Sequence, residues 1–207
     1  MRNTIICIGR EFGSGGHEIA VQLGQKLNLK VYEKNLTGIA CKFGEISEKR
    51  LAASDERAAN PYLYETVHEG NYHVIRGLPT SEVLFQLQSH EIRRIANEQD
   101  CIFVGRCADF VLKDADIQCI RVFVSAPFED RVRRKMQQEK LTSKERTRRL
   151  VRKMDRQRSQ YYNHFTGQKW GDPENYDLYI DCGITGIEGA VELICNKYVS
   201  AKDVAVF

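Results

Sequence analysis

The sequence contains no run of about 18 apolar residues, which is the length that a helix needs to cross a bilayer. The apolar stretch near the N-terminus is too short for the core of a signal peptide, so we predict a cytoplasmic protein. No Cys-x-x-Cys pair occurs among the seven cysteines, and Cys7, Cys101 and Cys119 lie inside apolar runs. This pattern indicates reduced, buried thiols rather than a disulfide framework or a zinc site.

Flexible linkers, internal repeats and low-complexity tracts are also absent. What is present is a chain of 207 residues, 42% hydrophobic and 29% charged, which is the composition of an ordinary globular protein. This length is typical of one domain, so we predict a single domain over residues 1–207. Within it, residues 45–98 are predicted to form a helical insertion.

Short β-branched runs alternate along the chain with longer stretches of helical periodicity. Five strands are predicted, over residues 4–8, 29–32, 101–105, 120–125 and 176–181. Helices are predicted over residues 17–27 and 79–97, and capping-box motifs at Thr142 and Thr185 predict where two further helices start. Buried strands separated by helices are typical of a parallel sheet covered on both faces, so the predicted fold class is α/β.

The net charge of +3 is unevenly distributed. Between Arg131 and Arg158, thirteen lysines and arginines accompany three acids, a local charge of +10, so the rest of the chain carries −7. Such a segment indicates an anionic partner or a solvated helical face. Nucleic acid is one candidate partner, although the segment has no Tyr or Phe that could stack on bases.

The most informative motif is Gly-Arg-Glu-Phe-Gly-Ser-Gly-Gly-His at residues 9–17, directly between the first predicted strand and the first predicted helix. Glycines permit positive φ angles, so consecutive N–H groups can surround phosphate oxygens, and the helix N-terminus adds partial positive charge. A tight turn without a ligand is the alternative interpretation. The predicted phosphate-binding residues are Gly13, Ser14, Gly15, Gly16 and His17.

This run differs from a standard Walker A sequence. The position of the Walker lysine falls on Gly16, and the position of the metal-binding Ser or Thr falls on His17. Arg10 is the candidate for the missing positive charge. Ser14 is the candidate hydroxyl ligand for Mg²⁺.

Together with segments further along the chain, this motif resembles the cytidylate kinase-like family of P-loop proteins. Residues 8–16 are similar to the opening motif of that family, and residues 104–109 (Val-Gly-Arg-Cys-Ala-Asp) are similar to its Gly-Arg-Asp segment. Residues 155–158 resemble the Asp-x-x-Arg of its lid, and residues 169–177 resemble its run into the last strand. The resemblance implies a three-layer P-loop NTPase fold, with a mainly parallel five-stranded sheet and an arginine-rich helical lid over about residues 131–165.

The resemblance also implies roles for individual residues. Arg106 and Arg158 are expected to contact phosphate and, with Arg10, to act in catalysis. Candidates for binding the acceptor are Asp109, Asp155 (through a ribose hydroxyl) and Arg76 in the insertion. Further lid charges are expected at Arg131, Arg134, Arg149 and Arg152. The implied cofactors are ATP and Mg²⁺, and the implied partner is a small nucleotide substrate, with neither a membrane nor a nucleic acid; the oligomeric state is left open.

The predicted function is ATP-dependent phosphoryl transfer to a nucleoside monophosphate or a similar small acceptor. Three groups of the family pattern are absent: the lysine at Gly16, an acid at Val104 and an acid at Cys107. Two alternatives therefore stay open. One is a nucleotide-binding module or sensor without turnover, and the other is an RNA-binding protein that uses the basic segment.

Overall fold

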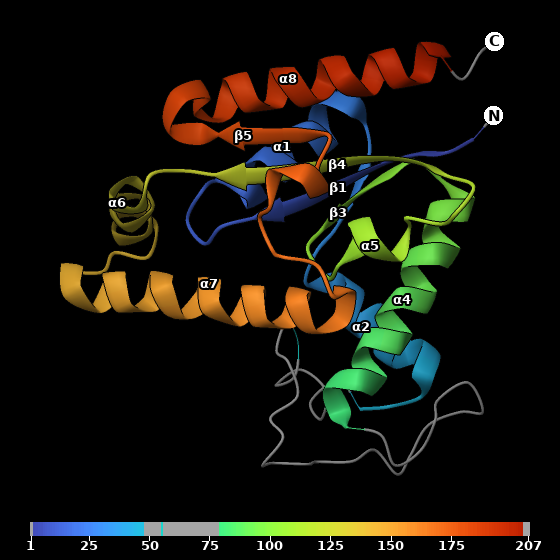
Figure 1. Ribbon diagram of the computed structural model, residues 1–207, viewed down its shortest axis with the longest axis horizontal. Coiled ribbons are helices and arrows are strands. Elements are labelled where there is room, and N and C mark those ends of the chain that lie inside the picture. The colour runs from blue at the N-terminus through green and yellow to red at the C-terminus, as the bar shows by residue number, and fades with distance from the viewer. Residues whose placement is uncertain (1, 48–54, 56–78, 205–207) are drawn as a thin grey trace.

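The computed structural model describes residues 2–47, 55 and 79–204. Its five strands form one sheet in the order β2-β3-β1-β4-β5, in which every neighbouring pair is parallel (Figure 1). This confirms the predicted five-stranded parallel sheet. The strands are β1 (Thr4–Arg10), β2 (Lys30–Tyr32), β3 (Cys101–Val104), β4 (Gln118–Ser125) and β5 (Leu178–Asp181).

Seven helices connect and cover these strands in the described part of the chain. They are α1 (Gly16–Leu27), α2 (Asn35–Gly44), α4 (Thr80–Glu98), α5 (Ala108–Val111), α6 (Phe128–Gln138), α7 (Lys144–Thr166) and α8 (Cys182–Val204), with a 3₁₀ turn at Pro173–Asn175. No helix in the described ranges is long and apolar enough to span a membrane.

The capping-box prediction at Thr142 misses the helix cap by one residue, and the one at Thr185 falls next to a kink inside α8 rather than at its first residue. Helix α7 is capped by Ser143, whose hydroxyl accepts a hydrogen bond from the Arg146 N–H, and not by Thr142. Helix α8 begins at Cys182, before Thr185, because the chain turns into a helix directly after β5 and then kinks at Gly186, where φ is 66°. The Thr185 hydroxyl donates to the Asp181 carbonyl instead of capping a helix.

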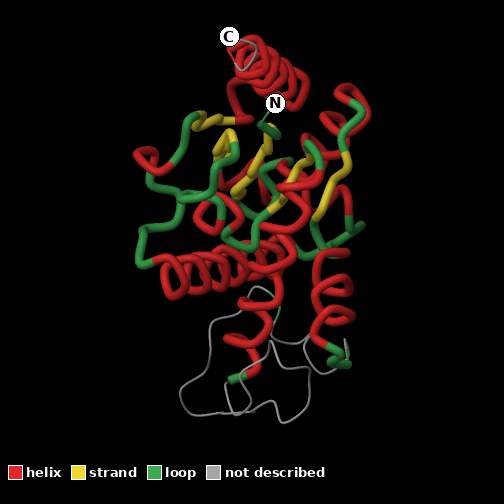
Figure 2. The backbone as a smooth tube through the Cα atoms, turned by 90° about the vertical axis from the view of Figure 1, so that its right-hand side faces the viewer, coloured by secondary structure: helices red, strands yellow, loops and turns green. Residues whose placement is uncertain are grey.

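The sheet lies between two layers of helices (Figures 1 and 2). Side chains alternate along a strand, so Ile6 and Ile8 of β1 pack in the core beneath α1 and α8. Ile5 and Cys7 pack on the opposite face, in the core shared with α4 and α5. Each fully buried aliphatic side chain contributes about 1.5–3 kcal/mol to folding. The apolar character of both faces of β1 thus explains the three-layer architecture that the sequence predicts.

Helix α4 is the main described part of the insertion predicted over residues 45–98, and it packs against one face of the sheet. Helix α2 lies against α4, and a separate apolar cluster that includes Cys41, Leu84 and Leu87 joins them. Arg76, predicted to bind the acceptor, lies outside the described residues, as do the rest of 48–54 and 56–78.

The fold brings distant segments to one edge of the sheet. In a parallel sheet the carboxyl ends of the strands share an edge, and ligands of open α/β proteins bind in the crevice outside it. The glycine-rich loop follows β1 at this edge. Helices α6 and α7, which contain most of the predicted lid range 131–165, pack against each other, and their side chains reach the same loop.

Candidate phosphate-binding site

The backbone of the glycine-rich loop is suited to an anion. Gly13 and Gly15 have φ angles of 83° and 101°, which side-chain-bearing residues rarely adopt. A Cβ atom on Gly15 would also lie 2.2 Å from the Cδ1 atom of Ile187. Position 15 therefore needs glycine for its conformation, and a side chain there would also require the end of the Ile187 side chain to shift.

Helix α1 begins at this loop without a side-chain cap. Its first backbone hydrogen bond runs from the Ile19 N–H to the Gly15 carbonyl, at 2.9 Å. The N–H groups of Gly16, His17 and Glu18 lie in the first turn, where the N–H groups of any helix lack an acceptor within that helix. They carry the positive end of the helix dipole. All three residues line a cavity of about 400 Å³, which we call the loop cavity.

The walls of the loop cavity carry more positive than negative charge, with five lysines and arginines against Glu11, Glu18 and Glu33. Cationic side chains reach it from the loop itself, from the segment after β2, and from helices α6 and α7; they are Arg10, Lys34, Arg134, Lys135 and Arg158. Converging N–H groups and cations are the donors that phosphate oxygens accept most strongly. The predicted phosphate site is therefore an accessible cavity with matching donors.

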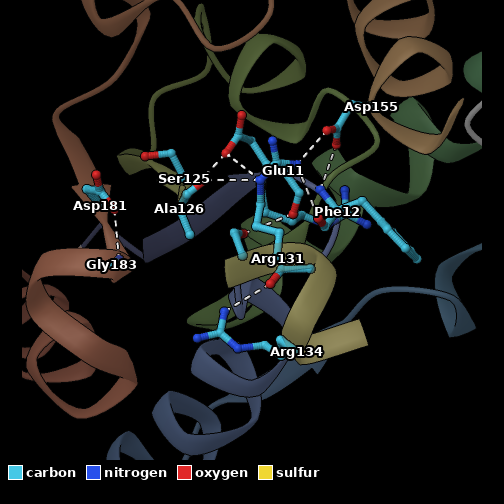
Figure 3. Close-up of polar contacts among 12 residues, drawn as sticks. Glu11, Phe12, Ser125, Ala126, Arg131, Arg134, Asp155, Asp181 and Gly183 are labelled. Atoms are coloured by element: carbon cyan, nitrogen blue, oxygen red, sulfur yellow. Dashed lines mark hydrogen bonds and ion pairs between the residues drawn. The ribbon is translucent and has the colours of Figure 1, made fainter. Parts of the chain in front are cut away.

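Arginines of the lid helices hold the carbonyl groups of the loop. The Arg158 Nη1 atom donates to the Arg10 carbonyl at 3.1 Å, and Arg134 Nη1 donates to the Gly13 carbonyl at 2.9 Å. Arg131 Nη1 donates to the Phe12 carbonyl at 3.2 Å. These bonds fix the loop backbone, and Figure 3 shows those of Arg131 and Arg134.

Asp155 of α7 completes this link between lid and loop (Figure 3). Its Oδ1 atom accepts the Phe12 N–H at 2.7 Å, and its Oδ2 atom lies 2.5 Å from Arg131 Nη1. Arg131 also donates through Nε to the Ala126 carbonyl and lies 3.3 Å from Glu11 Oε2. Burial raises the pKa of Glu11, and the hydrogen bond from the Ala126 N–H only partly offsets this. Asp155, predicted to bind ribose, thus contacts the loop in this structure.

Arg10 passes directly beside Gly16. A Cβ atom on Gly16 would lie 2.6 Å from the Arg10 Cβ atom and 3.0 Å from its Cγ atom. Arg10 Nη2 lies 3.5 Å from Glu33 Oε1, while Glu33 Oε2 lies 2.5 Å from the His17 Nδ1 atom. The stem of Arg10 therefore occupies the room that a side chain at position 16 would need.

A second cavity lies on the other side of Arg10 and Arg158, and we call it the acceptor-side cavity. It measures about 20 Å³, which is room for little more than one water. Asp109 on its wall accepts a hydrogen bond from the Tyr162 hydroxyl at 2.8 Å, and burial raises the pKa of this carboxyl group. The remaining lining residues are Gly9, Gly105, Arg106, Cys107, Tyr161, Trp170 and Tyr176.

The turn after β3 is strained. Gly105, Arg106 and Cys107 have φ angles of 78°, 54° and 53°, so three consecutive residues are left-handed. A residue with a side chain costs about 1–2 kcal/mol in this conformation. Such strain is concentrated at functional sites, and here it directs the Arg106 side chain into the protein interior, where it is buried.

The structure brings most of the predicted site residues together. Gly13, Gly15, Gly16 and His17 line the loop cavity, Arg106 and Asp109 line the acceptor-side cavity, and Arg10 and Arg158 line both. Ser14 is the exception within the loop, because its buried hydroxyl donates to the Glu11 carbonyl at 2.9 Å.

The Ser14 hydroxyl is not directed at a Mg²⁺ ion bound beside phosphate in the loop cavity. Mg²⁺ takes oxygen ligands, commonly one or two carboxylates together with phosphates and water. Ser14 is turned toward the Glu11 carbonyl, whereas Glu11, Glu18 and Glu33 line the loop cavity and carry the carboxylate oxygens that would hold Mg²⁺ beside bound phosphates. The predicted Mg²⁺ role of Ser14 has no support in this geometry.

Sequence reasoning missed Phe12, Glu33 and Lys135 as site residues. Phe12 lies beneath two cations, with Lys135 Nζ 4.6 Å and Arg158 Cζ 5.5 Å from its ring centre. A signal for Glu33 was available, since it directly follows a predicted strand and so belongs at the carboxyl edge of the sheet. No local sequence pattern distinguishes Lys135 as a site residue, because it is one of many cations in its segment.

A parallel sheet with a glycine-rich phosphate loop after its first strand, and a lid of arginines above that loop, defines a protein of the P-loop kinase class. The chain belongs to the cytidylate kinase-like family, whose model matches residues 5–184.

Comparisons with solved structures agree with this fold. An uncharacterized protein from Eubacterium ventriosum is 28% identical and superposes with a TM-score of 0.71, over 96% of this chain and 99% of that one. Shikimate kinase from Bacteroides thetaiotaomicron is 11% identical, with a TM-score of 0.51 over 94% of this chain and 96% of that one. No match was found among curated proteins.

Proposed function

We propose that this protein transfers the γ-phosphoryl group of ATP to a nucleoside monophosphate or a similar small phosphorylated acceptor. The observation that carries the proposal is that the loop cavity and the acceptor-side cavity share two residues, Arg10 and Arg158. In-line transfer requires the donor phosphate and the acceptor to meet at one place, and both arginines lie where the two cavities adjoin. Family membership gives independent support for a kinase-type reaction.

The chain's own residues supply binding and charge stabilisation for this reaction. The N–H groups of Gly16 and His17 would bind the terminal phosphates of ATP, with Arg134 and Lys135 beside them. An acceptor phosphate oxygen attacks the γ-phosphorus, and the bond to the β–γ bridging oxygen breaks, which releases ADP and a nucleoside diphosphate. Arg10 and Arg158 would stabilise the negative charge on the transferring group.

A further cavity supplies room for the base of the donor nucleotide. It measures about 270 Å³, lies between α6 and the start of α8, and shares Arg134 with the loop cavity. Cys182 and Gly183 form one side of it. A nucleotide with its phosphates at the loop would extend its base in this direction.

The acceptor-side cavity must widen before an acceptor can enter, because about 20 Å³ is far below the volume of a nucleotide. Tyr161 and Tyr162 of α7 form part of its wall, so a shift of the lid helix would open it. Such opening and closing is common in enzymes that exclude water during phosphoryl transfer.

A nucleotide-binding protein without turnover is the second candidate, and the absence of the Walker lysine at Gly16 and of an acid at Val104 favours it. The RNA-binding alternative gains no support, because Arg131, Arg134 and Arg158 of the basic segment hold loop carbonyls.

The test is an assay of the purified protein with ATP, Mg²⁺ and a panel of nucleoside monophosphates. We expect ADP to accumulate together with one or more diphosphates, at a rate that depends on the acceptor. Binding of ATP in calorimetry without any diphosphate product would contradict phosphoryl transfer and support the second candidate.

A further inference from the structure

Three polar side chains from separate elements converge on one carboxylate next to the acceptor-side cavity. The Thr37 hydroxyl of α2 donates to Asp55 Oδ2 at 3.0 Å, and Gln88 Nε2 of α4 donates to Asp55 Oδ1 at 3.2 Å. Arg106 Nη2, from the strained turn after β3, lies 2.5 Å from Asp55 Oδ2. Each carboxylate oxygen therefore has at least one donor.

The donors are far more buried than the carboxylate that they hold. Thr37 is 3% exposed, Gln88 is 1% exposed and Arg106 is 4% exposed, whereas the Asp55 side chain is 20% exposed. The amide of Gln88 is held further by a bond from its Nε2 atom to Thr37 Oγ1 at 3.1 Å, and it accepts from the Tyr161 hydroxyl at 3.5 Å. The donors are thus built into the fold, and the carboxylate that they hold is the more exposed partner.

This group of donors belongs to the acceptor side of the site. Arg106 and Tyr161 both line the acceptor-side cavity. A buried guanidinium with a neighbouring hydroxyl and amide recognises a phosphate group by the same hydrogen bonds with which it recognises a carboxylate. A phosphate and the Asp55 carboxylate therefore cannot occupy these donors at the same time.

We propose that Thr37, Gln88 and Arg106 form an anion-binding site for the phosphate group of the acceptor, and that Asp55 occupies this site as an internal competitor. The inference rests on the proposed function for the identity of the ligand. It adds Thr37 and Gln88 as binding residues, and it makes Asp55 a residue that weakens acceptor binding while stabilising the protein without substrate.

The first experiment measures acceptor affinity by calorimetry with CMP and with cytidine, in the absence of ATP. Replacing the competitor, in Asp55→Ala and in the isosteric Asp55→Asn, should tighten CMP binding about tenfold, which corresponds to about 1.4 kcal/mol. Cytidine binding should not change, since cytidine has no phosphate. Adding Gln88→Leu to Asp55→Ala should remove the gain.

The second experiment uses inorganic phosphate as the probe and thermal unfolding as the readout. Asp55→Ala leaves the buried Arg106 without this counter-ion, so its Tm should fall in potassium chloride. Potassium phosphate at equal ionic strength should raise that Tm by more than it raises the Tm of the wild-type protein, where phosphate can act at the loop cavity alone. The Asp55→Ala/Gln88→Leu variant should lose this additional rise.

Two results would overturn the inference. One is a Tm of Asp55→Ala that falls without any additional response to phosphate, which would make Asp55 a structural partner of Arg106 only. The other is CMP binding that is detectable but not tightened in both Asp55 variants. Neither readout requires turnover, so a protein that phosphorylates no monophosphate but shows the phosphate response would contradict the proposed function and leave the anion site standing.

Discussion

Arg10 and Gly16 form a matched pair in the phosphate loop. The Arg10 stem lies where a side chain at position 16 would be, with only 2.6 Å between the two Cβ positions. The absence of the Walker lysine is thus accompanied by a cation that reaches the same cavity from six residues earlier. We propose that Arg10 supplies the positive charge that the Walker lysine would provide.

The first prediction tests this pair through exchange of the two residues. Arg10→Ala should lower kcat/KM for phosphoryl transfer by about 10²–10³, the cost of one preorganised charge contact. Gly16→Lys alone should not raise the rate and should lower Tm, because the new side chain meets Arg10. The double variant Arg10→Ala/Gly16→Lys should be more active than Arg10→Ala. A rate increase in Gly16→Lys alone would show that Arg10 does not occupy this space.

The second prediction concerns the buried carboxyl group of Asp109. Because burial raises its pKa, the folded protein retains the proton to a higher pH than the unfolded chain does. The protonated Asp109 carboxyl group therefore stabilises the folded protein at low pH, and this stabilisation is lost as the pH rises through the raised pKa. The Asp109→Asn variant has no titrating group at this position and should not lose this stability. Its free energy of unfolding relative to wild type, measured by urea titration, should therefore increase with pH across the acidic range.

Asp177 provides a control of opposite sign. Its burial would raise its pKa, but hydrogen bonds from Arg121 outweigh that effect and lower it. The ionised Asp177 carboxylate therefore stabilises the folded protein above the ordinary pKa of an aspartate, and this stabilisation is lost as the pH falls. Asp177→Asn should therefore lose stability relative to wild type as the pH rises. Parallel trends in the two variants would contradict the assignment for Asp109.

At the scale of elements, helix α7 is fastened to the phosphate loop by Asp155 and Arg158. Asp155 accepts the Phe12 N–H, and Arg158 donates to the Arg10 carbonyl. The same helix contributes Tyr161 and Tyr162 to the acceptor-side cavity. One helix thus lines both cavities, and under the proposed function it would link the donor site to the acceptor site.

The third prediction is that Asp155 positions the loop. A hydrogen bond to a charged group contributes about 1.5–3 kcal/mol, so Asp155→Ala should weaken ADP binding about tenfold or more. Hydrogen exchange at the Phe12 amide should become faster, a local change that general destabilisation would not produce on its own. Glu145→Ala, which removes an exposed acid from the same helix, should leave both quantities unchanged. Unchanged exchange at Phe12 in Asp155→Ala would rule out the positioning role.

At the scale of the whole molecule, local patterns carried the prediction of the fold. Five β-branched runs, helical spacing between them and a glycine-rich turn after the first strand are each visible within about ten residues, and all five strands occur in the structure. The helix starts near Thr142 and Thr185 were misplaced because Ser143 is an equally good cap and because Gly186 allows a kink. The packing of the whole chain, and not the local sequence, decides at which of several adjacent residues a helix begins.

The contacts of the site could be predicted only in part, because they join residues far apart in the sequence. Thr37, Asp55, Gln88 and Arg106 come from four separate segments, and no local spacing marks them as one cluster. Asp155 shows the same limit, since no local pattern indicated that its carboxylate accepts the Phe12 N–H, and its predicted ribose contact stays a prediction. Long-range polar networks follow from the assembled fold and not from any window of sequence.

The most direct test of the central claim is a crystal structure of the protein with ADP. We expect oxygens of the β-phosphate to lie within hydrogen-bond distance of the N–H groups of Gly15, Gly16 and His17, with Arg10 or Arg158 in contact with the same phosphate. A nucleotide bound elsewhere, with the loop cavity lacking phosphate at saturating ADP, would contradict it.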